Sequence, residues 1–205
     1  MHPNLAFRGE STARNLEFAR ARGFGVLAMA AQGAPLISHV PFLLNPAGDV
    51  VELHLVRSNP IVRLLAEPVP GRLVVSGPDS YVSPDWYGME EQVPTWNYVA
   101  VHLVGRLELR PQEEMRGLLD RLSAEFEGRL SPKVRWVADK MQPEGLERMM
   151  RMIVPCRFRI EDVQGTWKLG QNKPDAARMG AAEALEKAGT GAEVAALAAL
   201  MRAVS

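Results

Sequence analysis

Short apolar runs that alternate with polar residues recur along the chain, and they constrain its fold more than any other feature. In the segment DVVELHLV, the apolar side chains of Val51, Leu53 and Leu55 alternate with Glu52 and His54. Such an alternation with a period of two places the apolar side chains on one face of a β-strand and the polar side chains on the other. The segment therefore predicts a half-buried strand.

Turns of only a few residues separate these runs. Residues 24–44 hold two apolar runs joined by AQGAP, a turn sequence typical of an antiparallel hairpin. Strand patterns follow at residues 49–56, 71–83 and 95–110, and a last one at 156–169 closes the barrel. The order differs from an alternating array of strands and crossover helices. It predicts a mainly β protein with helices, namely a six-stranded antiparallel β-barrel with peripheral helices.

Helical patterns are inserted between the strands. Residues 112–128 carry apolar side chains at helical spacing and acidic residues in the first turn, which predicts an amphipathic helix. The Ala-rich C-terminal segment also favours a helix. We expect a barrel domain over residues 1–180 and a helical tail over residues 181–205. Further helices are expected at residues 12–22, after Asn59, and at 133–140 and 145–153.

Charge and composition restrict the partners of this chain. Its 24 basic and 24 acidic residues give a net charge of 0, so no global positive charge is available to neutralise a phosphate backbone. No run is apolar and long enough to cross a bilayer, and the first residues do not resemble a signal peptide. The single cysteine, Cys156, excludes an internal disulfide and is expected to be buried. We expect a cytoplasmic protein without a membrane partner.

Residues 93–102, VPTWNYVAVH, combine large aromatic side chains with hydrogen-bonding groups. On a strand, Trp96 and Tyr98 project to one face and Asn97 to the other. Aromatic planes next to an amide suit a flat heteroaromatic ligand, because stacking supplies contact area and the amide fixes orientation. The alternative is a core strand whose aromatic side chains only pack.

A second candidate is the sequence LVRSNP, which ends a strand and begins a helix. Arg57, Ser58 and Asn59 offer a guanidinium, a hydroxyl and backbone N–H groups at this junction. Arginine binds phosphate oxygens in a bidentate manner, so the combination predicts a phosphate site. The alternative is a solvated arginine next to an ordinary helix cap.

A third candidate is TWKLGQNKP, residues 166–174, which follows the last strand. Lys168, Gln171, Asn172 and Lys173 place many hydrogen-bond donors beside Trp167. Donors of this kind suit the electron-rich edge of a ring such as a flavin. The alternative is an ordinary surface turn.

Metal and hydrolase sites find no support in the sequence. His39 and His54 lie on successive predicted strands, but neither belongs to a metal-ligand spacing such as HExxH. No GxSxG motif is present, and no glycine-rich phosphate loop occurs. We therefore assign no catalytic residue and no metal ligand, and any nucleotide site has to be built from strand and loop side chains.

Five segments together resemble the PaiB family of FMN-binding transcriptional regulators, in the same order along the chain. They are LISHVPFLL, HLVRSNP, GPDSYVSPDWY, VPTWNYVAVHLVGRLE and GTWKLGQNKP, and the resemblance covers about residues 1 to 180. It implies an FMN-binding split barrel similar to the pyridoxine phosphate oxidases, which are homodimers with FMN at the subunit interface. One departure is Gly170, where the family usually has serine.

The resemblance also implies the residues that contact FMN. One strand would run along the edge of the ring, the Arg57 segment would take the phosphate, and the long strand and the C-terminal turn would contact the ring, the turn coming from either subunit. The residues are Ser38, His39, Val40, Pro41, Arg57, Ser58, Asn59, Trp96, Asn97, Trp167, Lys168, Gln171, Asn172 and Lys173.

Two functions of different classes follow. The first is an FMN-binding regulatory protein of the PaiB type, a negative transcriptional regulator with flavin at a dimer interface. Direct DNA binding is the weaker part of this hypothesis, since the net charge is 0 and no helix-turn-helix is evident. The alternative is an FMN-dependent oxidoreductase acting on a small molecule. An interaction protein with a vestigial flavin site is a third alternative.

Overall fold

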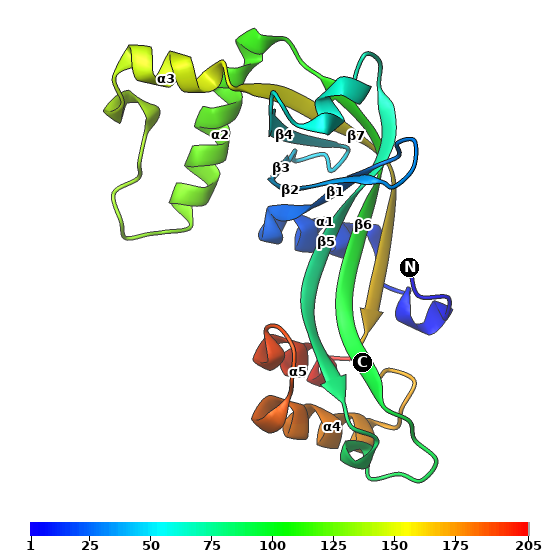
Figure 1. Cartoon of the computed structure of the whole chain (residues 1–205). Helices are drawn as coiled ribbons and strands as arrows, with labels where there is room; N and C mark the ends of the chain where they lie inside the picture. Colours follow the sequence, from blue (N-terminus) through cyan, green and yellow to red (C-terminus); the bar gives the residue numbers. More distant parts are fainter. Residues whose placement is uncertain (205) are drawn as a thin grey trace. The chain divides into compact units, whose positions relative to one another are not determined.

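The structure, a computed structural model, describes residues 1–204. Within these residues the chain forms two compact units, each assembled from separate stretches of sequence. Unit 1 contains Met1–Phe18, Val75–His102 and the chain from Val163 onward, and unit 2 contains Ala19–Val74 and Leu103–Asp162. Three long strands supply residues to both units (Figure 1).

In the described part of the chain, seven strands form one sheet in the order β2-β1-β5-β6-β7-β4-β3. Antiparallel pairing joins β1 to β2 and β5, and joins β4 to β3 and β7. The mainly β class, the antiparallel sheet and the peripheral helices are thus confirmed. The strands are β1 (Phe24–Met29), β2 (Leu36–Pro41), β3 (Leu43–Leu44), β4 (Val50–Val56), β5 (Val69–Val82), β6 (Thr95–Leu109) and β7 (Ile153–Lys168).

The strand count is seven where the sequence predicted six, because one apolar run becomes two strands. The run LISHVPFLL breaks at Phe42, whose backbone N–H donates to the carbonyl of Gly23 at 2.8 Å. The residues before the break form β2 and pair with β1, whereas those after it form β3 and pair with β4. Since β2 and β3 lie at opposite ends of the strand order, this continuous segment joins the two edges and the sheet curls.

In residues 1–204, five α-helices and several 3-10 turns accompany the sheet. The helix expected over 133–140 shrinks to a 3-10 turn, because the Glu127 carboxylate accepts the backbone N–H of Trp136 at 2.8 Å and Val137 is extended. No helix in residues 1–204 is long and apolar enough to cross a membrane. The helices are α1 (Thr12–Arg22), α2 (Met115–Gly128), α3 (Pro143–Met150), α4 (Asp175–Ala188) and α5 (Val194–Arg202), and the 3-10 turns are η1 (Leu5–Phe7), η2 (Pro60–Leu64), η3 (Pro84–Tyr87), η4 (Gln112–Glu114) and η5 (Ala138–Lys140).

The core of unit 2 lies on the apolar face of β4. Val51, Leu53 and Leu55 are almost fully buried, as the alternation predicted. On the other face of β4, Glu52 forms an ion pair with Arg121 of α2 at 2.8 Å. This pair ties α2 to the strand, so α2 covers part of the face that the sequence assigned to polar residues.

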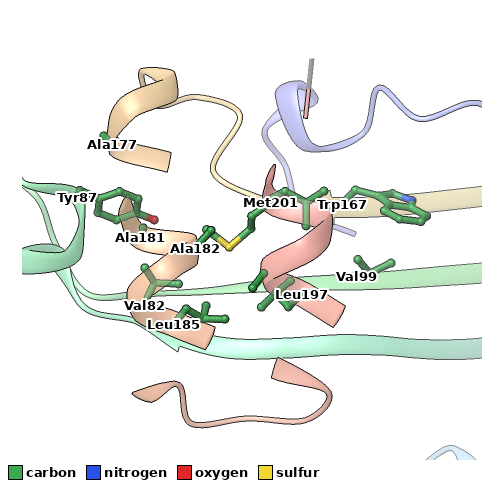
Figure 2. Close-up of a cluster of buried hydrophobic side chains, with 12 residues drawn as sticks. Val82, Tyr87, Val99, Trp167, Ala177, Ala181, Ala182, Leu185, Leu197 and Met201 are labelled. Atoms are coloured by element: carbon green, nitrogen blue, oxygen red, sulfur yellow. The ribbon is translucent and has the colours of Figure 1, made fainter. Parts of the chain in front are cut away.

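The core of unit 1 is formed by α4 and α5 against three strands. Figure 2 shows Leu185 of α4 and Leu197 and Met201 of α5 gathered with Val82 of β5 and Val99 of β6. All five side chains are almost fully buried. The expected domain boundary at residue 180 falls inside α4, so the Ala-rich segment supplies core residues to this unit.

Candidate functional site

In unit 2, the strand LISHVP separates its side chains into two sets. Val40 is 2% exposed and belongs to the core, whereas His39 lies on the opposite face and stacks on Phe24 with ring centroids 6.4 Å apart. The hydroxyl of Ser38 accepts a hydrogen bond from Nδ2 of Asn59 at 3.2 Å. Pro41, at the end of the strand, is half-buried. The structure thus brings Ser38 and Asn59 together.

Asn59 also begins the short helix that the sequence predicted. Its Oδ1 accepts the backbone N–H of Ile61 at 3.0 Å, and Pro60 occupies the first helical position of η2. A single amide therefore caps the turn through its oxygen and holds Ser38 through its nitrogen. Ser58, the preceding residue, is exposed.

Arg57 is exposed and points toward the segment that follows α3. Its Nε donates to the carbonyl of Arg151 at 2.8 Å, and its Nη2 donates to Oε1 of Gln112 at 2.8 Å and to the carbonyl of Ile153 at 3.3 Å. These contacts fix the guanidinium at the surface. The partners of the guanidinium do not include Ser38 or Asn59.

In unit 1, β6 alternates as the sequence predicted. Asn97 is 1% exposed, whereas Trp96 is 47% exposed on the other face. Nδ2 of Asn97 lies 3.5 Å from the sulfur of Met201, and its Oδ1 is buried without a hydrogen-bond partner among the described residues. Burial raises the pKa of the nearby Tyr87 phenol, and a hydrogen bond with Asn97 acts in the opposite direction. Asn97 is therefore part of the α4–α5 core.

Trp167 belongs to the same core. Its indole Nε1 donates to Oδ1 of Asn15 at 2.8 Å, and its ring meets Phe18 edge to face at a centroid distance of 5.4 Å. The guanidinium of Arg14 lies 4.5 Å from the ring centroid. With 3% of its surface exposed, Trp167 uses its donor and its ring within unit 1.

The turn after β7 is closed by Gln171. Its Oε1 accepts the backbone N–H of Leu169 at 2.8 Å, and its Nε2 donates to the carbonyl of Trp167 at 2.6 Å. Gly170 has a φ of +82°, a region in which a residue with a Cβ is strained. Glycine therefore suits this position in the turn, while Asn172 remains exposed.

Lys168 and Lys173 are half-buried and reach polar partners. Nζ of Lys168 contacts the hydroxyl of Thr95, and Nζ of Lys173 contacts Oε1 of Gln92. Burial lowers the pKa of Lys168, and the positive charge of Lys173 lowers it further. The sequence did not predict these two contacts, although Thr95 lies within the aromatic motif, because they depend on how the chain around the start of β6 meets the end of β7.

The period of two separates the motif residues of unit 1 into a core face and an opposite face. Asn97 and Trp167 face the core, so Trp96 and Lys168, each one residue away on its strand, project to the opposite face. Trp96 meets Tyr81 of β5 edge to face at 6.5 Å, and Nζ of Lys168 lies 5.8 Å from the ring of Phe7. This face combines aromatic planes with an ammonium group.

Each unit, taken by itself, offers accessible groups whose chemistry suits part of a flavin nucleotide. A guanidinium and a hydroxyl–amide pair in unit 2 suit phosphate oxygens, and an aromatic face with an ammonium group in unit 1 suits an acceptor-rich ring. No group of three His, Cys, Asp or Glu side chains in residues 1–204 could hold a metal ion.

Comparison with known proteins gives the same ligand class. Residues 1–162 match the domain family described as "Putative FMN-binding domain". The Bacillus subtilis protein "Protease synthase and sporulation protein PAI 2" is 31% identical over 171 residues, which are 82% of this chain and 81% of that protein.

Solved structures share the fold at low sequence identity. The FAD and heme binding protein from Mycobacterium smegmatis superposes with a TM-score of 0.56 at 19% identity, covering 79% of this chain and 73% of that one. Flavocytochrome Anf3 from Azotobacter vinelandii gives a TM-score of 0.58 at 12% identity, covering 82% of this chain and 72% of that one. Together with the family match over most of the sequence, these similarities mean that the chain belongs to the PaiB family of FMN-binding split-barrel proteins.

Proposed function

We propose that the flavin ring binds on the aromatic–lysine face of unit 1, defined by Tyr81, Trp96, Tyr98 and Lys168. The observation that carries this proposal is the separation of faces: the motif residues opposite the α4–α5 core are an exposed indole and a half-buried ammonium group. Aromatic side chains supply stacking area, and the ammonium stabilises the negative charge that a reduced flavin gathers at its pyrimidine side.

The remaining motif residues of unit 1 support this face. Asn97 and Trp167 lie in the core behind it, and Gln171 closes the turn that carries Lys173. We propose that these are positioning residues, and that Lys173 and Asn172 add donors at the end of β7. The sequence motif WKLGQNK would then contain both residues that position the strand and turn, and residues that bind the flavin.

For the FMN phosphate we propose the polar side chains of unit 2. Ser38 and Asn59 form a preassembled hydroxyl–amide pair, and Ser58 and the exposed Arg57 follow one another at the end of β4. Charge-assisted hydrogen bonds from a guanidinium to phosphate are stronger than neutral ones. The proposed strand edge of His39, Val40 and Pro41 lies next to this group.

We propose that the chain acts as a homodimer with FMN at the subunit interface. Besides the family resemblance, an exposed apolar patch on β1 and β2 supports this assembly: Phe24 is 54% exposed and Ile37 is 60% exposed. Both lie beside His39 on the same face of the hairpin. Contiguous exposed apolar side chains are typical of surfaces that a partner covers.

The function that we propose is regulation through the flavin, because the relative from B. subtilis is named for protease synthesis and sporulation. Bound FMN supplies electron transfer, and the protein would respond to its occupancy or redox state. A net charge of 0 favours regulation without a large DNA-binding surface.

Two measurements on the purified FMN-bound protein test this function. A regulator keeps its flavin oxidised for minutes under anaerobic NADPH or NADH, whereas rapid bleaching with turnover would indicate an oxidoreductase instead. Binding to promoter DNA is then measured across a salt series in the oxidised and reduced states. Binding that neither prefers the promoter nor changes with flavin state would contradict regulation by direct DNA contact.

A further inference from the structure

Unit 2 contains a cavity between α2 and α3 that none of the proposed flavin contacts lines. Its volume is about 370 Å³, and its walls are almost entirely apolar. Leu119 of α2, Trp136 of the connecting segment and Leu146 of α3 are among the residues that line it. Pockets that hold small molecules span about 300–1,000 Å³ and are mostly apolar, so this cavity has the size of a ligand site.

Methionines form much of the wall. Met141, Met149, Met150 and Met152 all line the cavity, and Met149 and Met152 are 55% and 61% exposed at its rim. Thioether side chains are flexible and make favourable contacts with aromatic rings. Trp136 adds an aromatic plane to the same wall. This lining favours a flat aromatic ligand over a purely aliphatic one.

Two polar side chains are also part of the lining. Arg116 and Ser123 line the cavity, and both also line a neighbouring cavity of about 310 Å³. The guanidinium of Arg116 is held by Asp120 at 2.9 Å and by Asp139 at 2.8 Å, so its charge is already balanced. The polar group of a ligand is therefore better neutral, with a hydrogen bond to the Ser123 hydroxyl, than anionic, because an anion on Arg116 would face these two aspartates.

We propose that this Met-rich pocket, lined by Leu119, Ser123, Trp136, Leu146 and Met150 among others, binds a small aromatic molecule with one neutral polar group. The rings lie among the methionines, and the polar group meets Ser123. All lining residues belong to unit 2, and none of them contacts flavin in the proposal above. The test of the pocket and the test of the flavin site are therefore independent of one another.

Isothermal titration of the FMN-bound full chain with naphthol, a neutral bicyclic aromatic alcohol, tests the pocket. We expect one molecule bound per chain. Leu119→Trp fills the cavity from α2 and should weaken binding by about tenfold or more, and Ser123→Ala should weaken it by about threefold to tenfold. Met149→Trp fills the rim from an exposed position and gives a second variant with little risk to folding. Leu130→Ala, at a 53% exposed position outside the lining, is the matched control.

The alternatives give distinct results. Absence of naphthol binding overturns the proposal. Unchanged naphthol binding in both Leu119→Trp and Met149→Trp also overturns it, provided that both variants keep native circular dichroism and flavin absorbance. Tighter binding of dodecanol than of naphthol overturns the aromatic class. A change in oligomeric state on Met149→Trp, seen by sedimentation, would mean that a second copy covers the pocket and would also overturn it.

Discussion

The indole Nε1 of Trp167 donates a hydrogen bond of 2.8 Å to Oδ1 of Asn15, and both side chains are only 3% exposed. The bond joins α1 to the end of β7 within unit 1. It engages the only polar atom of the indole. Trp167, which the family motif suggests as a flavin contact, is therefore a core residue whose donor is already satisfied.

Replacing Asn15 by Leu should destabilise the protein by about 1–3 kcal/mol, because a buried indole N–H loses its acceptor. The change is measured as the free energy of unfolding in urea. Leu130→Ala, at a 53% exposed position, is the control and should change stability by less than about 0.5 kcal/mol. Unchanged stability of Asn15→Leu together with weaker FMN binding would show that Trp167 serves the ligand.

Trp96→Ala should have the opposite signature. The side chain is 47% exposed, so its loss costs little stability, while the lost stacking of about 0.5–1.5 kcal/mol weakens FMN binding by about twofold to twelvefold. Fluorescence titration of the apoprotein with FMN measures the affinity. Equal affinity in the wild type and the variant would place the ring elsewhere.

Arg57→Ala should weaken FMN binding by about 1.5–3 kcal/mol through loss of a charge-assisted phosphate contact. The same change removes the hydrogen bonds of Arg57 to the carbonyls of Arg151 and Ile153 and to Gln112. Gln112→Ala is therefore the matched control, because it removes one of these partners and keeps the guanidinium. If Arg57→Ala and Gln112→Ala have the same affinity for FMN as each other, Arg57 has only a structural role.

Cys156 should make stability fall at alkaline pH. Burial raises the pKa of its thiol from 9.0 to about 12, so above about pH 9 the unfolded chain loses a proton that the folded chain keeps. Stability is then lost as the pH rises from about 9 to about 12, by about 1.4 kcal/mol at about pH 10. Urea unfolding at about pH 8 and about pH 10 measures the loss, and Cys156→Val removes this part of it. Rapid alkylation of the folded protein by iodoacetamide at about pH 8 would contradict the burial of the thiol.

Local sequence patterns were sufficient for most of the helices and strands and for the buried face of β4. The alternation of Val51, Leu53 and Leu55 predicted the buried face of β4, and Asn59 predicted the start of η2. The break at Phe42 was missed, because the run around it remains apolar and β-compatible throughout. The two halves of this run are separate strands only because the first pairs with β1 and the second pairs with β4.

The sequence predicted which motifs belong to the candidate site, but not which of their residues pack in the core and which face a ligand. The period of two predicts that Trp96 and Asn97 lie on opposite faces of the strand, but it does not predict which face a distant helix covers. Helices α4 and α5 cover the Asn97 side, and this contact is made by residues about one hundred positions later in the chain. The direction of Arg57 likewise depends on Arg151 and Ile153, which lie far along the sequence.

FMN binding by this chain can be read from the absorption spectrum of the purified protein. The spectrum should show the near-ultraviolet and blue bands of an oxidised flavin, and mass spectrometry of the released cofactor should identify FMN, with about one molecule per chain. A colourless protein that does not take up FMN when the cofactor is added would show that the chain is not a flavoprotein.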